Sequence, residues 1–166
     1  KFLRANFLYL SYLFRHKYYV FVAGIKVGAP IFRLIIHDWH KFLPSEYFAY
    51  LSYFYFGNKE IPLNKDSWKR NASEEVKKAF DLAWNFHQKR AKHHYQYWVL
   101  IKDDGKIKPL EMPNKYVKEL VADWAGAGRA LTGKWEVWDW YQKNKDNILL
   151  EKYTRVMVEC YLLKFC

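Results

Sequence analysis

Cysteine is scarce in this chain, which holds two cysteines among 166 residues, Cys160 and Cys166. Their spacing of six residues matches neither a zinc motif nor a short disulfide framework. Disulfide frameworks belong to oxidising compartments, so their absence favours a reduced chain. We therefore expect a cytoplasmic location.

A long uncharged apolar run is also missing. Residues 2–36 are rich in Phe, Leu, Tyr and Val, but five cations interrupt them: Arg4, Arg15, Lys17, Lys26 and Arg33. Because a membrane-spanning helix needs about 20 predominantly apolar residues, this segment is not expected to cross a bilayer. A secretory signal is not expected either, because no small-residue cleavage site follows a short apolar run. The sequence therefore predicts no membrane partner.

Acidic residues are few, 17 against 28 lysines and arginines, so the formal net charge is +11. The basic residues are dispersed, and their densest cluster is Lys89, Arg90 and Lys92. A basic excess suits nucleic acid, an anionic membrane or a small phosphorylated substrate. A dispersed excess is equally typical of a solvated surface, so charge alone leaves the partner open.

Internal repeats and low-complexity segments are absent, and the length suits one domain with its own core, so we predict a single domain over residues 1–166. Apolar residues recur every three or four positions through most of the chain, which predicts an all-α fold. The exception is Asp103-Asp104-Gly105, a turn sequence between two short apolar stretches, which predicts a small β-hairpin. Residues 57–70 are predicted to form a loop, a candidate lid over a substrate.

Two apolar patterns in the first 27 residues predict helix. The first has spacings of three or four and consists of Leu3, Phe7, Leu10 and Phe14. The second shares one helical face and consists of His16, Val20, Ala23 and Val27. His16 is therefore predicted on a buried stripe, where a histidine is more often a core residue than a ligand unless it finds partners elsewhere.

The most informative stretch is Ile35 to Phe42, in which an apolar helix leads into His37, Asp38 and, three residues later, Lys41. We expect this helix to carry Asp38 inward on a face that it shares with Ile31, Leu34 and Ile35. A buried carboxylate needs a compensating cation, which an arginine, a lysine or a metal would supply. A neighbouring histidine and carboxylate suit a divalent metal, and Lys41 would then face a phosphate oxygen.

Three more histidines follow in a helix that the sequence predicts from Ser73. His87 and His94 are seven residues apart, two turns along one face. His93 is rotated by about 100° from His94 in such a helix. We favour His94 as a metal ligand and expect His93 to bind a neighbour or a substrate phosphate.

The next predicted helix carries Glu119 and Asp123 four residues apart, on one face. Asp123 is a predicted metal ligand. Glu119 would orient a ligand histidine or accept a proton, although a surface pair with Lys115 explains it nearly as well. Further along, the Gly126–Gly128 pair follows no strand and is no dinucleotide fingerprint. Arg129 is a candidate for phosphate binding.

The order of these groups resembles the HD superfamily of metal-dependent phosphohydrolases: a histidine, a His-Asp pair with a lysine three residues further on, two histidines and an aspartate. Five segments also resemble an uncharacterised HD-like family of phage and bacterial genomes, catalogued as a domain of unknown function, number fifty-six sixty-two. These segments are residues 16–20, 37–42, 93–98, 110–113 and 119–124. The resemblance implies an HD-like helical bundle with one or two metals, but no substrate. Ala91 departs from it, because that family is expected to have an asparagine there in a contact around the ligands.

Six groups are predicted to form the metal site: His16, His37, Asp38, His87, His94 and Asp123. The first metal would take His16, His37, Asp38 and Asp123, and the other two histidines would serve a second metal bridged by Asp38. Mn, Fe, Co, Zn and Mg all remain candidates. We predict a metal-dependent phosphohydrolase acting on a nucleotide or another small phosphoester. Its catalytic residues would be Asp38, Lys41 and Glu119, and its substrate-binding residues Lys41, His93 and Arg129.

Two alternatives belong to other classes of protein. Some proteins that resemble the HD superfamily hold two irons in a similar set of ligands and oxidise their substrates with oxygen. A basic helical module could instead bind nucleic acid without catalysis, with its histidines in structural roles. The first alternative predicts turnover that depends on oxygen, and the second predicts salt-sensitive binding that does not need Asp38.

Overall fold

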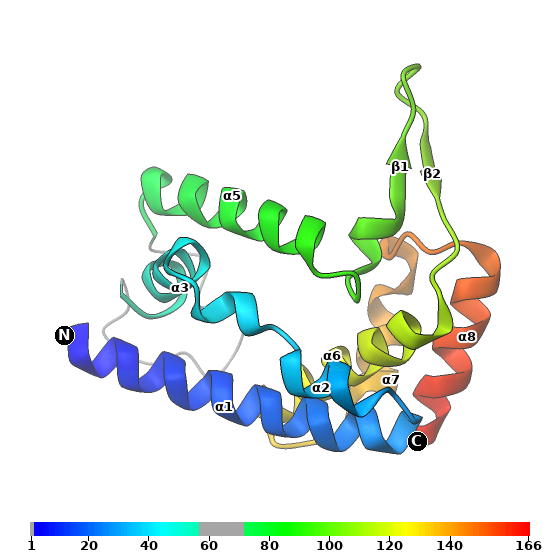
Figure 1. Ribbon diagram of the computed structural model, residues 1–166, viewed down its shortest axis with the longest axis horizontal. Coiled ribbons are helices and arrows are strands. Elements are labelled where there is room, and N and C mark those ends of the chain that lie inside the picture. The colour runs from blue at the N-terminus through cyan, green and yellow to red at the C-terminus, as the bar shows by residue number, and fades with distance from the viewer. Residues whose placement is uncertain (1, 57–71) are drawn as a thin grey trace.

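The computed structural model describes residues 2–56 and 72–166 of the chain, and its fold is all-α with one small hairpin, as predicted (Figure 1). The helices are α1 (Phe2–Val27), α2 (Ile31–Ile36), α3 (Pro44–Leu51), α5 (Glu74–Arg90), α6 (Asn114–Thr132), α7 (Val137–Asn144) and α8 (Lys152–Leu162). Short helical turns include η1 (Trp39–Phe42), η2 (Ser52–Phe56) and η3 (Tyr95–Trp98). The candidate lid at 57–70 lies outside the described residues.

The hairpin follows α5 and precedes α6 in the chain, and it projects from the helical body (Figure 1). Its strands, β1 (Val99–Ile101) and β2 (Ile107–Pro109), pair antiparallel with Leu100 opposite Lys108. Gly105 takes the positive φ of 78° that the tight turn requires. Both cysteines are free and exposed. In the described part of the chain, no helix is long and apolar enough to cross a membrane.

Helix α1 runs along one side of the molecule, with α3 beside its N-terminal half, α5 packed on α3, and α6 along its C-terminal half (Figure 1). One apolar cluster gathers Tyr9 and Leu13 of α1 with side chains of α3 and α5. A second, larger cluster gathers Val20 and Val27 with side chains of α2, α6, α7 and α8. His16 lies on α1 between these two clusters, so the fold places it where the two halves of the molecule meet.

Close packing of α1 on α6 depends on a glycine. A Cβ added at Gly126 would lie 2.5 Å from the backbone nitrogen of Val20, closer than real side chains approach. The missing side chain therefore lets the two backbones come together. Since this contact is about one helical turn from His16 on α1 and from Asp123 on α6, it also draws those two residues together.

The apolar pattern at the start of α1 faces solvent rather than the core. Leu3, Phe7 and Phe14 are 84%, 69% and 63% exposed, and the buried stripe of this half runs through Tyr9 and Leu13. The stripe from His16 to Val27 is buried as predicted. The two patterns belong to opposite sides of one continuous helix. The side that carries small residues packs on α6, because small side chains allow the two helices to approach closely.

The expected inward face of α2 is correct for Leu34 and Asp38 but wrong for Ile31 and Ile35. Ile31 and Ile35 are 57% and 60% exposed, and Leu34 is the buried residue of this helix. Asp38 is buried for another reason: α2 ends at Ile36, and Asp38 adopts a left-handed conformation with φ 54° and ψ 24°. This turn points the carboxylate inward. Aspartate tolerates such a conformation better than most residues, at a cost of order 1 kcal/mol.

Candidate metal centre

Four predicted ligands from three segments converge in the middle of the molecule, and we call them the His16 set. The set consists of His16 from α1, His37 and Asp38 from the turn after α2, and Asp123 from α6. His16 Nε2 lies 3.4 Å from Asp38 Oδ2 and 3.3 Å from Asp123 Oδ1. His37 Nε2 lies 3.5 Å and 3.4 Å from the same two oxygens. Two histidines and two carboxylates thus face one point.

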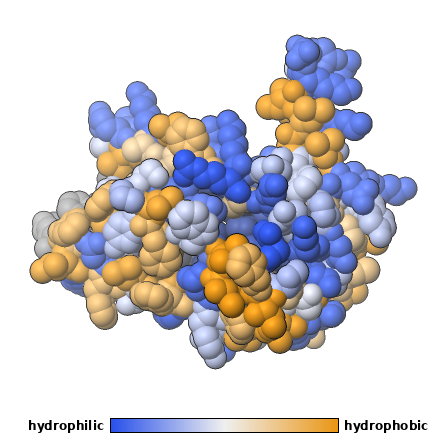
Figure 2. All heavy atoms as spheres, in the orientation of Figure 1, coloured by the Kyte–Doolittle hydropathy of each residue, from blue (hydrophilic) through white to orange (hydrophobic). Residues whose placement is uncertain are grey.

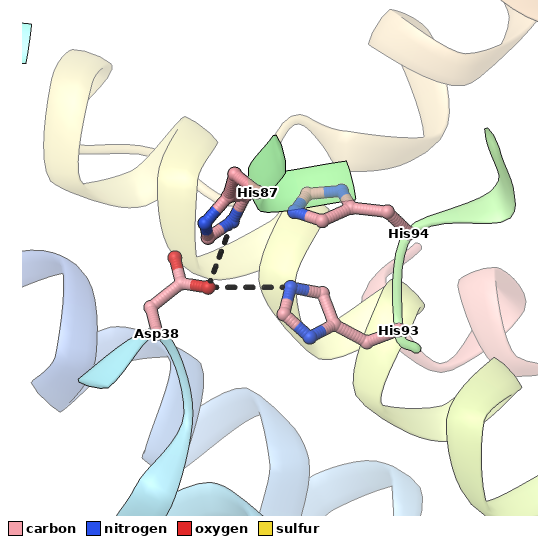
Figure 3. A group of neighbouring side chains, drawn as sticks. All are labelled: Asp38, His87, His93 and His94. Atoms are coloured by element: carbon pink, nitrogen blue, oxygen red, sulfur yellow. Dashed lines mark ion pairs between the residues drawn. The ribbon is translucent and has the colours of Figure 1, made fainter. Parts of the chain in front are cut away.

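A second group, the His87 set, uses the other oxygen of the same aspartate. It consists of Asp38, His87, His93 and His94 (Figure 3). Asp38 Oδ1 lies 3.3 Å from His87 Nε2 and 3.4 Å from His93 Nε2. The His94 ring lies beside both, with its centroid 4.9 Å from that of His87 and 4.2 Å from that of His93. Asp38 therefore belongs to both sets.

The helix that was expected to carry both His87 and His94 ends earlier, at Arg90. Ala91 leaves the helical region with φ −92° and ψ 97°, and His93 and His94 lie in the turn that follows. The expected choice between the two histidines, which rested on a continuous helix, is therefore unfounded. His93, which we had assigned to the substrate, faces Asp38 directly, and both histidines lie in the His87 set.

The donor atoms of both sets are spaced as metal ligands are, and several of them make no hydrogen bond within the described residues. Six nitrogen–oxygen distances across the two sets fall between 3.3 and 3.5 Å, longer than ordinary hydrogen bonds. Donors about 2.0–2.2 Å from a shared ion in tetrahedral array would lie about 3.3–3.6 Å apart. Among the residues that the structure describes, no hydrogen-bond partner reaches Asp38 Oδ1 or the buried Nε2 atoms of His16, His37, His87, His93 and His94. Such atoms are costly unless they bind something.

Two buried glutamates hold the opposite sides of the imidazole rings. Glu119 accepts a hydrogen bond from His37 Nδ1 at 3.2 Å and lies 3.3 Å from His93 Nδ1. Glu46 accepts a hydrogen bond from His87 Nδ1 at 2.8 Å. When Nδ1 carries the proton in these bonds and the ring is neutral, as a metal ligand must be, Nε2 directs a free lone pair toward Asp38.

An arginine supports each glutamate in turn. Arg33 Nε donates to Glu119 at 2.6 Å, and an Arg90 nitrogen donates to Glu46 at 3.2 Å. Glu119 is 2% exposed, so its alternative role in a surface pair with Lys115 is not found. A third possible donor group joins Glu119 to His37 and His93. The bonds to Arg33 and to the Nδ1 atoms favour an orienting role for Glu119 instead.

The charges in the centre shift its pKa values strongly. Burial lowers the pKa of His37, but the carboxylates of Asp38, Asp123 and Glu119 outweigh burial and raise it to about 10. Burial raises the pKa of Glu119, yet His37 and His93 bring it down to about 2. Against burial again, His37 and Lys41 hold the pKa of Asp38 well below its usual value. The carboxylates of the centre are therefore ionised and ready to bind cations.

Comparison with known proteins gives a family for the chain but no activity. A family described as "Family of unknown function (DUF5662)" matches residues 5–164. The chain belongs to this family. No curated protein and no solved structure was found to be similar. Family DUF5662 carries no stated activity, so the match assigns no chemistry to this member.

Of two residues predicted to contact substrate in this member of DUF5662, Lys41 lies at the metal centre and Arg129 does not. Lys41 Nζ lies 2.5 Å from Asp38 Oδ2, on the same side of the centre as the sequence predicted. Arg129 instead donates to the carbonyl of Gly133 and stacks against the rings of Tyr19 and Trp135. It follows Asp123 by six residues, about 9 Å along α6, so the fold does not bring it into either set.

Glu46 is the residue of the centre that sequence reasoning missed. It stands in the first turn of α3 after Pro44, where an acidic residue is explained by the helix dipole alone. Its 1% exposure and its bond to His87, 41 residues away, become visible only in the fold. The sequence offers no spacing rule that would have joined the two.

Proposed function

We propose that this protein is a metal-dependent phosphohydrolase that acts on a nucleotide or another small phosphoester. The observation that carries the proposal is the Asp38 carboxylate, whose two oxygens face two separate sets of buried donors. Such sharing suits a pair of divalent ions, one held by the His16 set and one by the His87 set. When bound, a pair of this kind supplies an activated water and neutralises charge that develops on phosphoester oxygens.

The chain's own residues would do the remaining work. Asp38 holds the two sets together, and Glu46 and Glu119 fix the orientation of the histidines. Lys41 keeps its proton, because Asp38 outweighs the effect of burial and raises the pKa of the lysine well above its usual value. A protonated amine beside the centre suits a phosphate oxygen. The donor types, imidazole and carboxylate, fit Mn, Fe, Co or Zn better than they fit Mg.

The test is a screen of metal-stripped protein against nucleotides and phosphate esters, with Mn, Mg, Co, Fe and Zn added singly. We expect release of inorganic phosphate with at least one metal and its loss in Asp38→Ala. His40→Ala is the matched control, because His40 stacks on Trp39 near the centre but belongs to neither donor set. Activity that survives Asp38→Ala would refute the proposal.

Two further arms separate the other classes of function. Turnover under air that stops without oxygen, with no phosphate released, would identify an iron oxygenase in place of a hydrolase. Salt-sensitive binding to generic DNA that Asp38→Ala leaves unchanged, in protein without phosphatase activity, would identify a nucleic-acid-binding module.

A further inference from the structure

Helix α1 carries a second apolar stripe on the side that faces away from the core. Its members recur at three, four or seven residues and therefore share one side of the helix: Leu3, Phe7, Phe14, Tyr18, Phe21 and Ile25. They are between 37% and 84% exposed. From Leu3 to Ile25 the stripe runs about 33 Å along the helix. An apolar strip of this length on a surface marks a contact with something else.

The stripe continues over α2 and η1. Four side chains of α2 and two of η1 are at least 37% exposed: Ile31, Phe32, Ile35, Ile36, Trp39 and Phe42. The ring centroids of Phe14 and Phe42 are 6.2 Å apart, and Lys17 Nζ donates to the carbonyl of Ile35, so the elements lie side by side. We call the combined surface the α1–α2 face. Figure 2 shows apolar side chains over both elements.

The charge of this face has one sign. Residues 2–45 contain six lysines and arginines and a single acidic residue, Asp38, which is buried in the metal centre. Arg4, Arg15 and Lys26 are exposed and eleven residues apart, which is close to three turns and puts them along one edge of the stripe. In the described part of the chain, none of these three has an ion-pair partner. An apolar strip is thus bordered by unneutralised cations.

We propose that the α1–α2 face binds the surface of an anionic lipid bilayer. An amphipathic helix that lies in the interface combines an apolar side with flanking Lys and Arg, and this combination is what α1 presents. A second copy of the chain is disfavoured, because a two-fold contact between antiparallel copies of α1 would bring Arg4 against Lys26 and Arg15 against its own copy. Nucleic acid is disfavoured, because Leu3, Ile25 and the isoleucines of α2 cannot stack on bases.

Attachment to a bilayer surface needs no spanning helix. The expectation that the protein has no membrane partner rested on the cations that interrupt residues 2–36. In a helix that lies on the surface, those cations contact lipid headgroups while the apolar stripe reaches the acyl chains. The same residues that exclude a spanning segment thus favour a surface-bound one.

Co-sedimentation with lipid vesicles tests the proposal directly. We expect the protein to bind vesicles that contain phosphatidylglycerol, and to bind vesicles of phosphatidylcholine alone at least about tenfold more weakly, with binding reduced by salt. Equal binding to both kinds of vesicle, or binding to neither, would overturn the proposal.

Matched variants separate the apolar and the charged parts of the face. Phe7→Asp should weaken binding at least about tenfold, whereas Val156→Asp, on the exposed side of α8, should not. The double variant Arg4→Glu with Arg15→Glu should release the protein from anionic vesicles. Lys78→Glu with Lys89→Glu gives the same net charge and should leave binding unchanged. All four replaced cations are exposed, so the fold is expected to survive, which circular dichroism checks.

Two results would assign the face to another partner. If the protein binds no vesicles and Phe7→Asp converts a dimer in solution into a monomer, the face joins two copies of the chain. If it binds no vesicles but binds DNA, and the double arginine variant abolishes that binding, the partner is nucleic acid. Either result refutes a lipid surface.

Discussion

Replacing Glu46 by glutamine tests whether the two donor sets are separate sites. Glutamine keeps the shape of the side chain but removes the charge that accepts the Nδ1 proton of His87 at 2.8 Å and the Arg90 bond at 3.2 Å. A hydrogen bond to a charged group contributes about 1.5–3 kcal/mol. Since about 1.4 kcal/mol is a factor of ten, the loss corresponds to roughly 10- to 100-fold weaker metal binding.

The weaker metal binding of Glu46→Gln should be confined to the His87 set. Glu46 contacts His87 but no histidine of the His16 set, so Glu46→Gln should weaken one of two binding steps and leave the other. Glu119 contacts His37 of the His16 set and lies beside His93 of the His87 set. Glu119→Gln should therefore weaken both steps.

The assay is a competition titration in which zinc is shared between the protein and a coloured chelator. Glu159→Gln is the control, because Glu159 also accepts a side-chain hydrogen bond, from Tyr141 at 2.8 Å, but lies in neither donor set. It should bind zinc as the unchanged protein does. If Glu46→Gln and Glu119→Gln had the same effect, or none, the reasoning about two sets oriented by two glutamates would be refuted.

Three further predictions concern stability. The folded pKa of His37, about 10, exceeds the unfolded value near 6.5, so metal-free protein should lose up to about 1.4 kcal/mol of stability per pH unit from pH 7 to 9; a flat profile in urea unfolding would contradict this. Lys41→Gln removes one of the two cations beside Asp38, the other being protonated His37, and should cost up to about 3–5 kcal/mol in metal-free protein but less with metal bound; equal losses would argue against a metal at Asp38. Gly126→Ala forces a methyl group against the Val20 backbone and should lower stability by about 1–3 kcal/mol in thermal unfolding, whereas Gly128→Ala, with open space around it, should not.

Local patterns predicted the fold class and many of the groups in the centre. The helical stripe from His16 to Val27 is buried as expected, and the hairpin lies where its turn sequence indicated. The chemistry of adjacent His37 and Asp38 was informative because a buried carboxylate needs a cation whatever the surrounding fold. These inferences use short-range rules, which held here but failed for the helix expected to continue through His94.

Spacing alone did not decide which of two apolar faces lies inward. Helix α1 is apolar on both sides, so spacing alone could not show that Phe7 and Phe14 face solvent. The inward position of Asp38 comes from a left-handed turn rather than from a helix face. Glu46 was invisible because its partner His87 is 41 residues away and only the packing of α3 on α5 joins them. Long-range packing decides which face of α1 is buried and brings Glu46 to His87, whereas a local turn places Asp38.

Whether Asp38 joins two metal sites is decided by the metal content of the purified protein and of Asp38→Ala, each stripped with chelator and reloaded under identical conditions. Convergence of the His16 and His87 sets on one carboxylate predicts up to two ions per chain in the unchanged protein and loss of tight binding in the variant. A protein that takes up no metal, or that takes up as much without Asp38 as with it, would contradict the account.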